Sequence, residues 1–232
     1  MLGFLRSTIL SKIVMAVSGA AIVGFLIAHL SGNLLIFGGP EKINAYGQGL
    51  RDLGPLLWAL RIGILVFFVL HIITSIYLAD KNRSARPVSY EKKKSIQSTI
   101  ASRTMFFSGL TILTFVTYHL LHYTFGIVQP EFFHGEYILH DGRTTHDVYS
   151  MMIHGFQNPF IFITYLLAMT FVCMHLSHAI ASAFQTLGIN NTKYNSKIKM
   201  AGMGFAALIW IGYMSIPAGV MAGVLKLTNG GH

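Results

Sequence analysis

Charged side chains are absent from long stretches of this chain, each long enough to cross a bilayer as a helix. These stretches include residues 13–40, 62–79, 104–130 and 148–192. A membrane-spanning helix needs about 20 apolar residues, and lipid forces each span to satisfy its own backbone hydrogen bonds. Only 11% of the 232 residues are charged and 53% are hydrophobic, whereas soluble domains carry about 25% charged residues. These features predict an all-α membrane protein.

We expect five transmembrane helices in a single domain that occupies residues 1–232. The expected helices cover about 12–37, 55–79, 102–125, 158–186 and 198–225. Prolines and glycines support the boundaries, since Gly38-Gly39-Pro40 ends the first helix and Pro55 opens the second. The segment 127–157 is too long to be a simple connector, so we expect it to form structure over the outer face.

The distribution of lysine and arginine predicts how the helices are oriented. The amino terminus and the loops after the second and fourth helices hold 12 of the 17 basic residues, and the opposite side holds six of the eight acidic ones. We therefore expect a multi-pass protein of the inner (cytoplasmic) membrane, with its N-terminus cytoplasmic and its C-terminus outside. The net charge of +9 lies in loops beside the membrane. Contact with anionic lipid or with a protein partner explains this charge better than binding of nucleic acid.

Four histidines lie deep within the expected spans, at positions 29, 71, 119 and 175. Ionisable residues inside a membrane mark functional sites by default. A rise of about 1.5 Å per residue places His29 and His119 near the outer side, and His71 and His175 near the cytoplasmic side. Depth therefore pairs His29 with His119 and His71 with His175, with about 14–16 Å between the two layers. This arrangement predicts two bis-histidine haem sites, held by a bundle of the first four helices.

Two other interpretations of the histidines are weaker. A single intramembrane histidine is usually a hydrogen-bonded packing residue, but four at matched depths make coincidence a poor explanation. Zinc is disfavoured because two imidazoles per layer leave a tetrahedral site short of ligands. Haem iron needs only two axial ligands beyond its porphyrin.

The third and fourth helices each offer a choice of ligand. His119 and His122 are three residues apart, as are His175 and His178, so either member of each pair can face inward. Depth favours the first members. His122 and His178 are then candidates to bind haem propionates, and arginines can do the same by charge-assisted hydrogen bonds. The arginine candidates are Arg51 and Arg61 for the outer haem and Arg103 for the inner haem.

Small residues recur at every fourth position of the first helix, at Ala16, Ala20, Gly24, Ala28 and Gly32. Such a stripe allows a neighbouring helix to approach closely, or it leaves room for a porphyrin beside His29. The single cysteine, Cys173, excludes an internal disulfide and a cysteine-ligated iron–sulfur cluster within this chain.

Several segments together resemble a known family. They are IAHLSGNLLIFGGP (27–40), VLHIITS (69–75), YHLLHYTFG (118–126), HDVYSMMIHGFQNPF (146–160) and MHLSHAIASAFQTLG (174–188). These motifs resemble the cytochrome b membrane-anchor subunit of succinate dehydrogenases and fumarate reductases, in its single-chain, five-helix, two-haem form. The resemblance spans nearly the whole chain and implies two haem b groups, with axial ligands from the first four helices and from the first histidine of each HLxx pattern.

The resemblance also implies partners and a substrate. A flavoprotein subunit carrying FAD and an iron–sulfur subunit would dock on the cytoplasmic face, and electrons would pass between them and a quinone, with menaquinone the expected species. The chain would be the quinone-reactive subunit of the enzyme and would carry no succinate chemistry itself. A quinone site would lie by the outer haem, where the candidates are Tyr46, Arg51, Asp52, His146 and His154. Some family members carry a glutamate where this chain has Cys173, which puts their proton path in doubt here.

Two alternatives remain open from the sequence. One is the haem b subunit of another respiratory complex, such as a hydrogenase or a formate dehydrogenase. The other is a haem-free transporter that uses intramembrane histidines. The physiological direction of the reaction is not encoded in this chain.

Overall fold

The expected fold class is confirmed. A computed structural model describes residues 7–85, 103–189 and 193–227 of the chain. The described residues contain eight α-helices, one short 3-10 helix and two three-residue strands. Five of the helices are long and apolar enough to cross a membrane. The protein is therefore an all-α, multi-pass membrane protein with five candidate spans.

The five long helices begin and end within a few residues of the sequence-based limits. They are α1 (Thr8–Asn33), α3 (Pro55–Ser84), α5 (Met105–Tyr123), α8 (Pro159–Thr186) and α9 (Asn195–Met221). Helix α1 starts earlier than expected because Ser7 caps it, with its side chain accepting a hydrogen bond from the Leu10 amide at 3.4 Å. Asn158 caps α8 in the same way, and Pro159 takes the first helical position, which suits a residue without an amide proton.

An additional helix follows the first span. Helix α1 continues into the 3-10 helix η2 (Leu34–Gly38), and the chain then enters α2 (Pro40–Asp52). Gly39 makes the turn with a φ of 90°, a value that favours glycine. Helix α2 carries charged residues on its exposed face, which is why the apolar pattern of the sequence did not reveal it.

The segment 127–157 contains four short elements: α6 (Pro130–Phe133), β1 (Glu136–Ile138), β2 (Thr144–His146) and α7 (Val148–Gln157). The two strands form an antiparallel hairpin in which Tyr137 pairs with Thr145. Asp147 caps α7 by accepting from the Ser150 amide at 3.0 Å, and it also accepts from the side chain of Asn44 at 3.0 Å. Asn44 is fully buried, so this contact ties α2 to α7.

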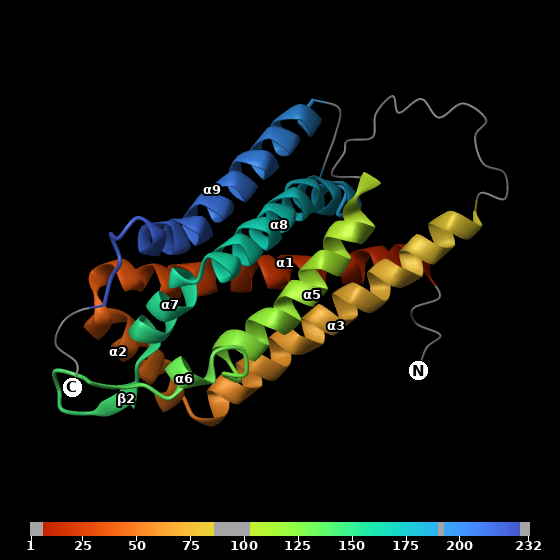
Figure 1. Ribbon diagram of the computed structural model, residues 1–232. Coiled ribbons are helices and arrows are strands. Elements are labelled where there is room, and N and C mark those ends of the chain that lie inside the picture. The colour runs from red at the N-terminus through yellow and green to blue at the C-terminus, as the bar shows by residue number, and fades with distance from the viewer. Residues whose placement is uncertain (1–6, 86–102, 190–192, 228–232) are drawn as a thin grey trace.

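The long helices pack as two layers that share one end. Helix α1 packs along α3, α5 packs along α8, and α9 lies along the far side of α8 (Figure 1). Helix α2, helices α6 and α7, and the two strands all gather at one end of the bundle, which we call the hairpin end (Figure 1). The helix pairs α1/α3 and α5/α8 thus form two layers, which touch where α1 packs against α8 and α9.

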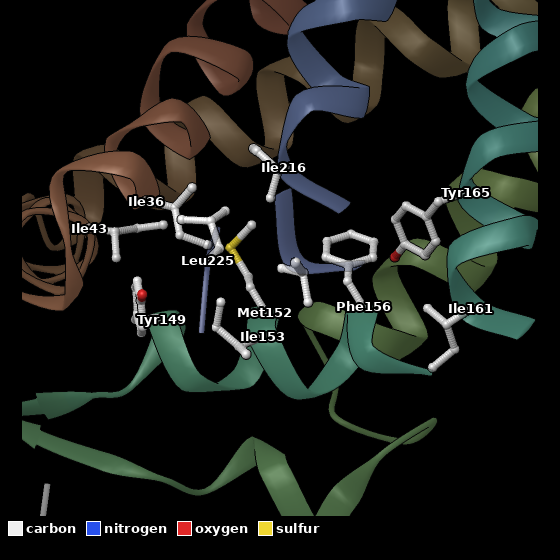
Figure 2. Packing of buried hydrophobic residues seen from close by; sticks show 11 residues of the cluster. Ile36, Ile43, Tyr149, Met152, Ile153, Phe156, Ile161, Tyr165, Ile216 and Leu225 are labelled. Atoms are coloured by element: carbon white, nitrogen blue, oxygen red, sulfur yellow. The ribbon is translucent and has the colours of Figure 1, made fainter. Parts of the chain in front are cut away.

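A buried apolar cluster fixes the hairpin end. It joins η2, α2, α7, α8 and α9 through residues that include Ile36, Ile153, Phe156, Tyr165 and Ile216 (Figure 2). Ile36 and Ile153 have no exposed surface at all. Because side chains from five elements interlock here, the hairpin end gives the helices that start or finish there a fixed mutual position.

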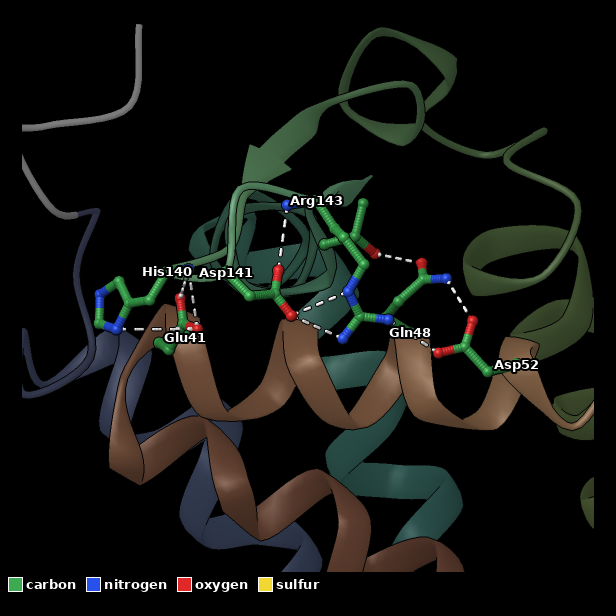
Figure 3. Close-up of polar contacts among 7 residues, drawn as sticks. Glu41, Gln48, Asp52, His140, Asp141 and Arg143 are labelled. Carbon is green, nitrogen blue, oxygen red and sulfur yellow. Dashed lines mark hydrogen bonds and ion pairs between the residues drawn. The ribbon is translucent and has the colours of Figure 1, made fainter.

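Polar contacts clamp the strand hairpin onto α2. Arg143 forms ion pairs with Asp52 at 3.0 Å and with Asp141 at 2.8 Å, and Glu41 accepts from the backbone amide of His140 at 3.1 Å (Figure 3). The Arg143 guanidinium holds the pKa of Asp141 below its usual value. These groups are exposed, so they orient the hairpin more than they stabilise it.

Candidate functional site

The structure brings the four intramembrane histidines together in two pairs. The imidazole centroids of His29 and His119, which we call the first pair, lie 5.8 Å apart. The centroids of His71 and His175, the second pair, lie 6.4 Å apart. These are the pairings that depth along the sequence suggests, and all four side chains are half-buried.

Each pair bridges the two helix layers. His29 stands on α1 and faces His119 on α5, while His71 stands on α3 and faces His175 on α8. The backbones of α1 and α5 do not pack closely along their length, and neither do those of α3 and α8. The two imidazoles of each pair therefore approach one another between helices whose backbones are not in close contact.

The spacing of the two pairs along α1 and α5 follows from the glycines that contact the second pair. His71 lies beside Gly19 of α1, and His175 lies beside Gly109 of α5. On each helix the histidine of the first pair follows that glycine by ten residues, as the residue numbers show. Ten residues correspond to about 15 Å of helix, so both helices place the two pairs about 15 Å apart.

Hydrogen bonds orient both imidazoles of the second pair. Nδ1 of His71 lies 3.2 Å from the carbonyl oxygen of Met15 and 3.4 Å from Oγ of Ser18. A carbonyl can only accept, so Nδ1 carries the proton and Nε2 keeps its lone pair. Nδ1 of His175 lies 3.0 Å from Oγ of Ser108. In the described part of the chain no hydrogen bond occupies Nε2 of either histidine, which leaves that atom available to a metal.

The first pair is supported differently at each member. Nδ1 of His119 lies 3.2 Å from the hydroxyl of Tyr165. His29 stacks on Phe25, with centroids 5.4 Å apart, and its Nε2 lies 3.2 Å from the amide nitrogen of Asn33. The Asn33 amide donates to the same lone pair that a metal would use. A ligand at Nε2 of His29 thus requires Asn33 to release this contact.

Helix α9 contributes an aromatic neighbour that sequence reasoning missed. Its Tyr213 ring lies 6.2 Å from His29, and its hydroxyl donates to the carbonyl of Leu26 at 2.8 Å. Helix α9 carries no histidine, so its part in the site is to pack beside α1. Gly212 permits this packing because a β-carbon there would lie 2.7 Å from Leu30.

The candidates for propionate binding are spread over the molecule. His122 is only 3% exposed and bonds to Tyr165 and Gln129, so its ring is already engaged inside the protein. His178 is half-buried one turn beyond His175. Arg61 is exposed on α3 and its guanidinium lies over Trp58 at 5.1 Å. Arg103 is exposed at the start of the α5 region, at the end opposite the hairpin.

The five quinone candidates do not form one cluster. Arg51 and His146 line a common pocket of about 270 Å³ together with His134, Glu136 and Thr145. That pocket is polar, which suits a water-soluble group better than an apolar ring.

The other three candidates lie apart from that pocket. Asp52 is held by Gln48 and Arg143. Tyr46 packs its ring against Gly32 of α1, and His154 stacks on Phe132 with centroids 4.1 Å apart.

Burial lowers the pKa of His146, and the positive charge of Arg51 lowers it further. A folded-state pKa below the ordinary 6.5 means that protonation opposes the folded hairpin end, so its stability should fall as the pH drops below about 6.5. We predict that Arg51→Gln raises the pKa of His146 towards its ordinary value. Histidine side-chain NMR titration measures this pKa. An unchanged or lower pKa in the variant would contradict the conclusion that the charge of Arg51 lowers the pKa of His146.

Two Ser-Gly dipeptides contact the histidines of the second pair, and a repeated sequence pattern identifies them. Ser18-Gly19 receives His71, and Ser108-Gly109 receives His175. A β-carbon on Gly19 would lie 3.2 Å from Cε1 of His71, and one on Gly109 would lie 3.8 Å from Cε1 of His175. The same Ser-Gly-x9-His pattern thus occurs on α1 and α5, a repeat that reading each helix separately does not reveal.

The small-residue stripe of α1 serves more than one purpose. Ala16 is buried, and Gly32 accommodates the ring of Tyr46 at the hairpin end. A β-carbon on Gly24, between the levels of the two pairs, would meet nothing within 4 Å. Part of the stripe therefore receives packing neighbours, and part of it faces open space.

The donor set fits haem better than a structural metal ion. An imidazole nitrogen binds a first-row metal at about 2 Å, so two imidazoles on opposite sides of one iron have ring centroids about 6 Å apart, close to both observed separations. Among the described residues no group of three or more metal-binding side chains occurs.

No family model, curated protein or solved structure matches this chain.

Proposed function

We propose that this chain is the membrane-anchoring cytochrome b subunit of a succinate:quinone or fumarate-reducing complex, with two haem b groups held by the first and second pairs. Bound haem supplies one-electron transfer, and two sites about 15 Å apart along the helices would carry electrons between the two faces of the membrane. The observation that carries the proposal is the meeting of four imidazoles in two pairs at 5.8 and 6.4 Å.

The protein's own residues would prepare each site for its ligand. Met15 and Ser18 fix the proton of His71 on Nδ1, and Ser108 orients His175, so that Nε2 of each ring keeps a lone pair. Because α1 and α5 do not pack closely along their length, and neither do α3 and α8, a flat macrocycle would find room between the rings. The surrounding apolar side chains would keep water away and set the local dielectric.

The charges at the two ends support the proposed orientation. Lys81, Arg83, Lys193 and Lys197 lie at the end opposite the hairpin, whereas the hairpin end holds acidic residues such as Glu41. The basic end would face the cytoplasm and receive the iron–sulfur and flavoprotein subunits. The remaining basic residues of the loop after the second span, within 86–102, lie outside the described residues.

An optical spectrum of the purified chain tests the haem proposal. We expect low-spin b-type bands and about two haems per chain, because each bis-imidazole site holds one iron. A colourless chain, or one haem per chain, would overturn the proposal, and a colourless chain would favour a transporter. Co-purification of the chain with FAD-containing and iron–sulfur polypeptides that oxidise succinate separates the proposed complex from a hydrogenase or formate dehydrogenase.

Gly19 offers a graded test of the second site. We predict that Gly19→Ala weakens haem binding at the second pair, because the new methyl would press against the ring of His71 at 3.2 Å and displace an oriented ligand, a change that typically costs 10–100-fold in affinity. Haem titration of the chain measures the loss. Gly204→Ala is the control, since α9 carries no histidine and a β-carbon there would meet nothing within 4 Å. Equal haem affinities in the two variants would contradict a role of the contact between Gly19 and His71 in haem binding.

A further inference from the structure

The geometry points to Tyr165 as a positioning residue for the first pair, which it serves through a directional hydrogen-bond chain ending at Gln129. The inference rests on the proposed function, because it concerns how His119 is prepared to bind iron. Tyr165 stands on α8, ten residues before His175, and does not belong to either histidine pair. Its hydroxyl lies 3.2 Å from Nδ1 of His119 and 3.3 Å from Nδ1 of His122.

The direction of each hydrogen bond in this chain follows from its far end. Nε2 of His122 lies 3.0 Å from Oε1 of Gln129, an amide oxygen that can only accept. Nε2 of neutral His122 therefore carries the proton, and its Nδ1 must accept. The Tyr165 hydroxyl donates to that Nδ1, which leaves its oxygen to accept from Nδ1–H of His119. This sequence of bonds keeps the lone pair of His119 on Nε2.

The chain of hydrogen bonds is rigid and dry. Tyr165 is 6% exposed and His122 is 3% exposed. The Tyr165 ring meets Phe115 and Phe156 edge to face, each with centroids 5.0 Å apart. Tyr123 stacks on His122 with centroids 3.9 Å apart. Rings packed on several sides cannot turn easily, so the hydroxyl of Tyr165 stays where both histidines need it.

An acceptor on Nδ1–H raises the basicity of a metal-bound imidazole and fixes its orientation. A more basic ligand favours the oxidised metal, so Tyr165 should hold the reduction potential of the first site down. The hydrogen-bond chain also connects this site to Gln129, the residue directly before α6 in the segment at the hairpin end. The second pair has a different support, since its partners are Ser18, Met15 and Ser108.

Potentiometric titration of the haem-loaded chain tests the inference with two tyrosine variants. Tyr165→Phe removes only the hydroxyl that bonds His119. We expect about tenfold weaker relative binding of the oxidised form at the first site, which is an upward shift of about 59 mV for one electron, with no change at the second site. Tyr123→Phe is the matched control, because the buried Tyr123 hydroxyl has no hydrogen-bond partner among the described residues. The His119→Ala chain identifies which potential belongs to the second site.

Two variants of His122 provide an independent test if Tyr165→Phe folds poorly. His122→Leu leaves the Tyr165 hydroxyl without its acceptor, so the hydroxyl oxygen is no longer held in place to accept from Nδ1–H of His119, and the potential of the first site should rise. His122→Asn places an acceptor oxygen near the position of Nδ1 and should restore the wild-type potential. The inference fails if Tyr165→Phe shifts the first site no more than Tyr123→Phe does, or if both sites shift equally. A wild-type chain without haem would instead refute the proposed function.

Discussion

Replacing His119 with alanine should reduce the haem content of the purified chain by half. The first pair would lose one of its two imidazoles, and a single remaining axial ligand cannot maintain a low-spin bis-histidine site. The second pair stands about 15 Å away by helix rise and shares no hydrogen-bond partner with His119, so its haem should remain. Pyridine haemochrome assay against protein concentration measures the ratio, and His71→Ala should give the complementary loss.

The control for this experiment is His140→Ala. His140 lies in the turn of the strand hairpin, its side chain is 83% exposed, and it is not a candidate for binding haem or quinone. We expect this variant to retain both haems. Loss of both haems from His119→Ala with unchanged helix content would contradict independent sites, and retention of both would remove His119 from the set of ligands.

The largest loss of stability is expected for Gly126→Ala, in the turn that follows α5. Gly126 has a φ of 66°, and a β-carbon there would overlap the ring of Phe133. The left-handed backbone costs an alanine about 1–2 kcal/mol, and overpacking costs about 1–3 kcal/mol more. We therefore expect a clear decrease in the thermal unfolding temperature of the chain in detergent.

Gly142 separates the two causes. It has a φ of 84° in the strand hairpin, but a β-carbon there would meet nothing within 4 Å. Gly142→Ala should therefore show the backbone cost alone and a smaller decrease in unfolding temperature. If the two variants unfold at the same temperature, the contact between Gly126 and Phe133 does not limit stability.

The fold could be predicted from the sequence where the absence of charged residues alone determines the structure. Long charge-free stretches identify the five spans because a bilayer excludes charge over a fixed thickness. Helix α2 was missed because it is amphipathic and lies outside those stretches, with Lys42 and Arg51 on its exposed side. The strand hairpin was also not predicted as strands, since it consists of two three-residue segments fixed by contacts such as Arg143 with Asp52.

The histidine pairs were predictable from depth because a straight helix converts residue number directly into position along the membrane normal. Rotation about the helix axis is what the sequence left open. It decides that His119 faces His29 while His122 points to Gln129. The supporting groups Ser18, Ser108 and Tyr165 were missed for the same reason, since a lone hydroxyl in an apolar helix usually bonds to its own backbone.

The quinone candidates show the limit of reasoning from neighbouring polar residues. Arg51 and His146 come together across α2 and β2, as contact between loops on one face allows. Asp52 is instead drawn to Arg143 in the hairpin, and His154 stacks on Phe132. Tertiary contacts within the segment 127–157 decided these positions, and no periodic pattern encodes them.

The division of the bundle into α1/α3 and α5/α8 layers has a consequence for biosynthesis. Each histidine pair takes one imidazole from the first half of the polypeptide and one from the second. On a translating ribosome, the pair near the hairpin end is fully synthesised once residue 119 has emerged, whereas the other must wait for residue 175. Under the proposed function, a nascent chain arrested between α5 and α8 would hold the imidazoles for one porphyrin only, so prosthetic groups would be acquired in a fixed temporal order.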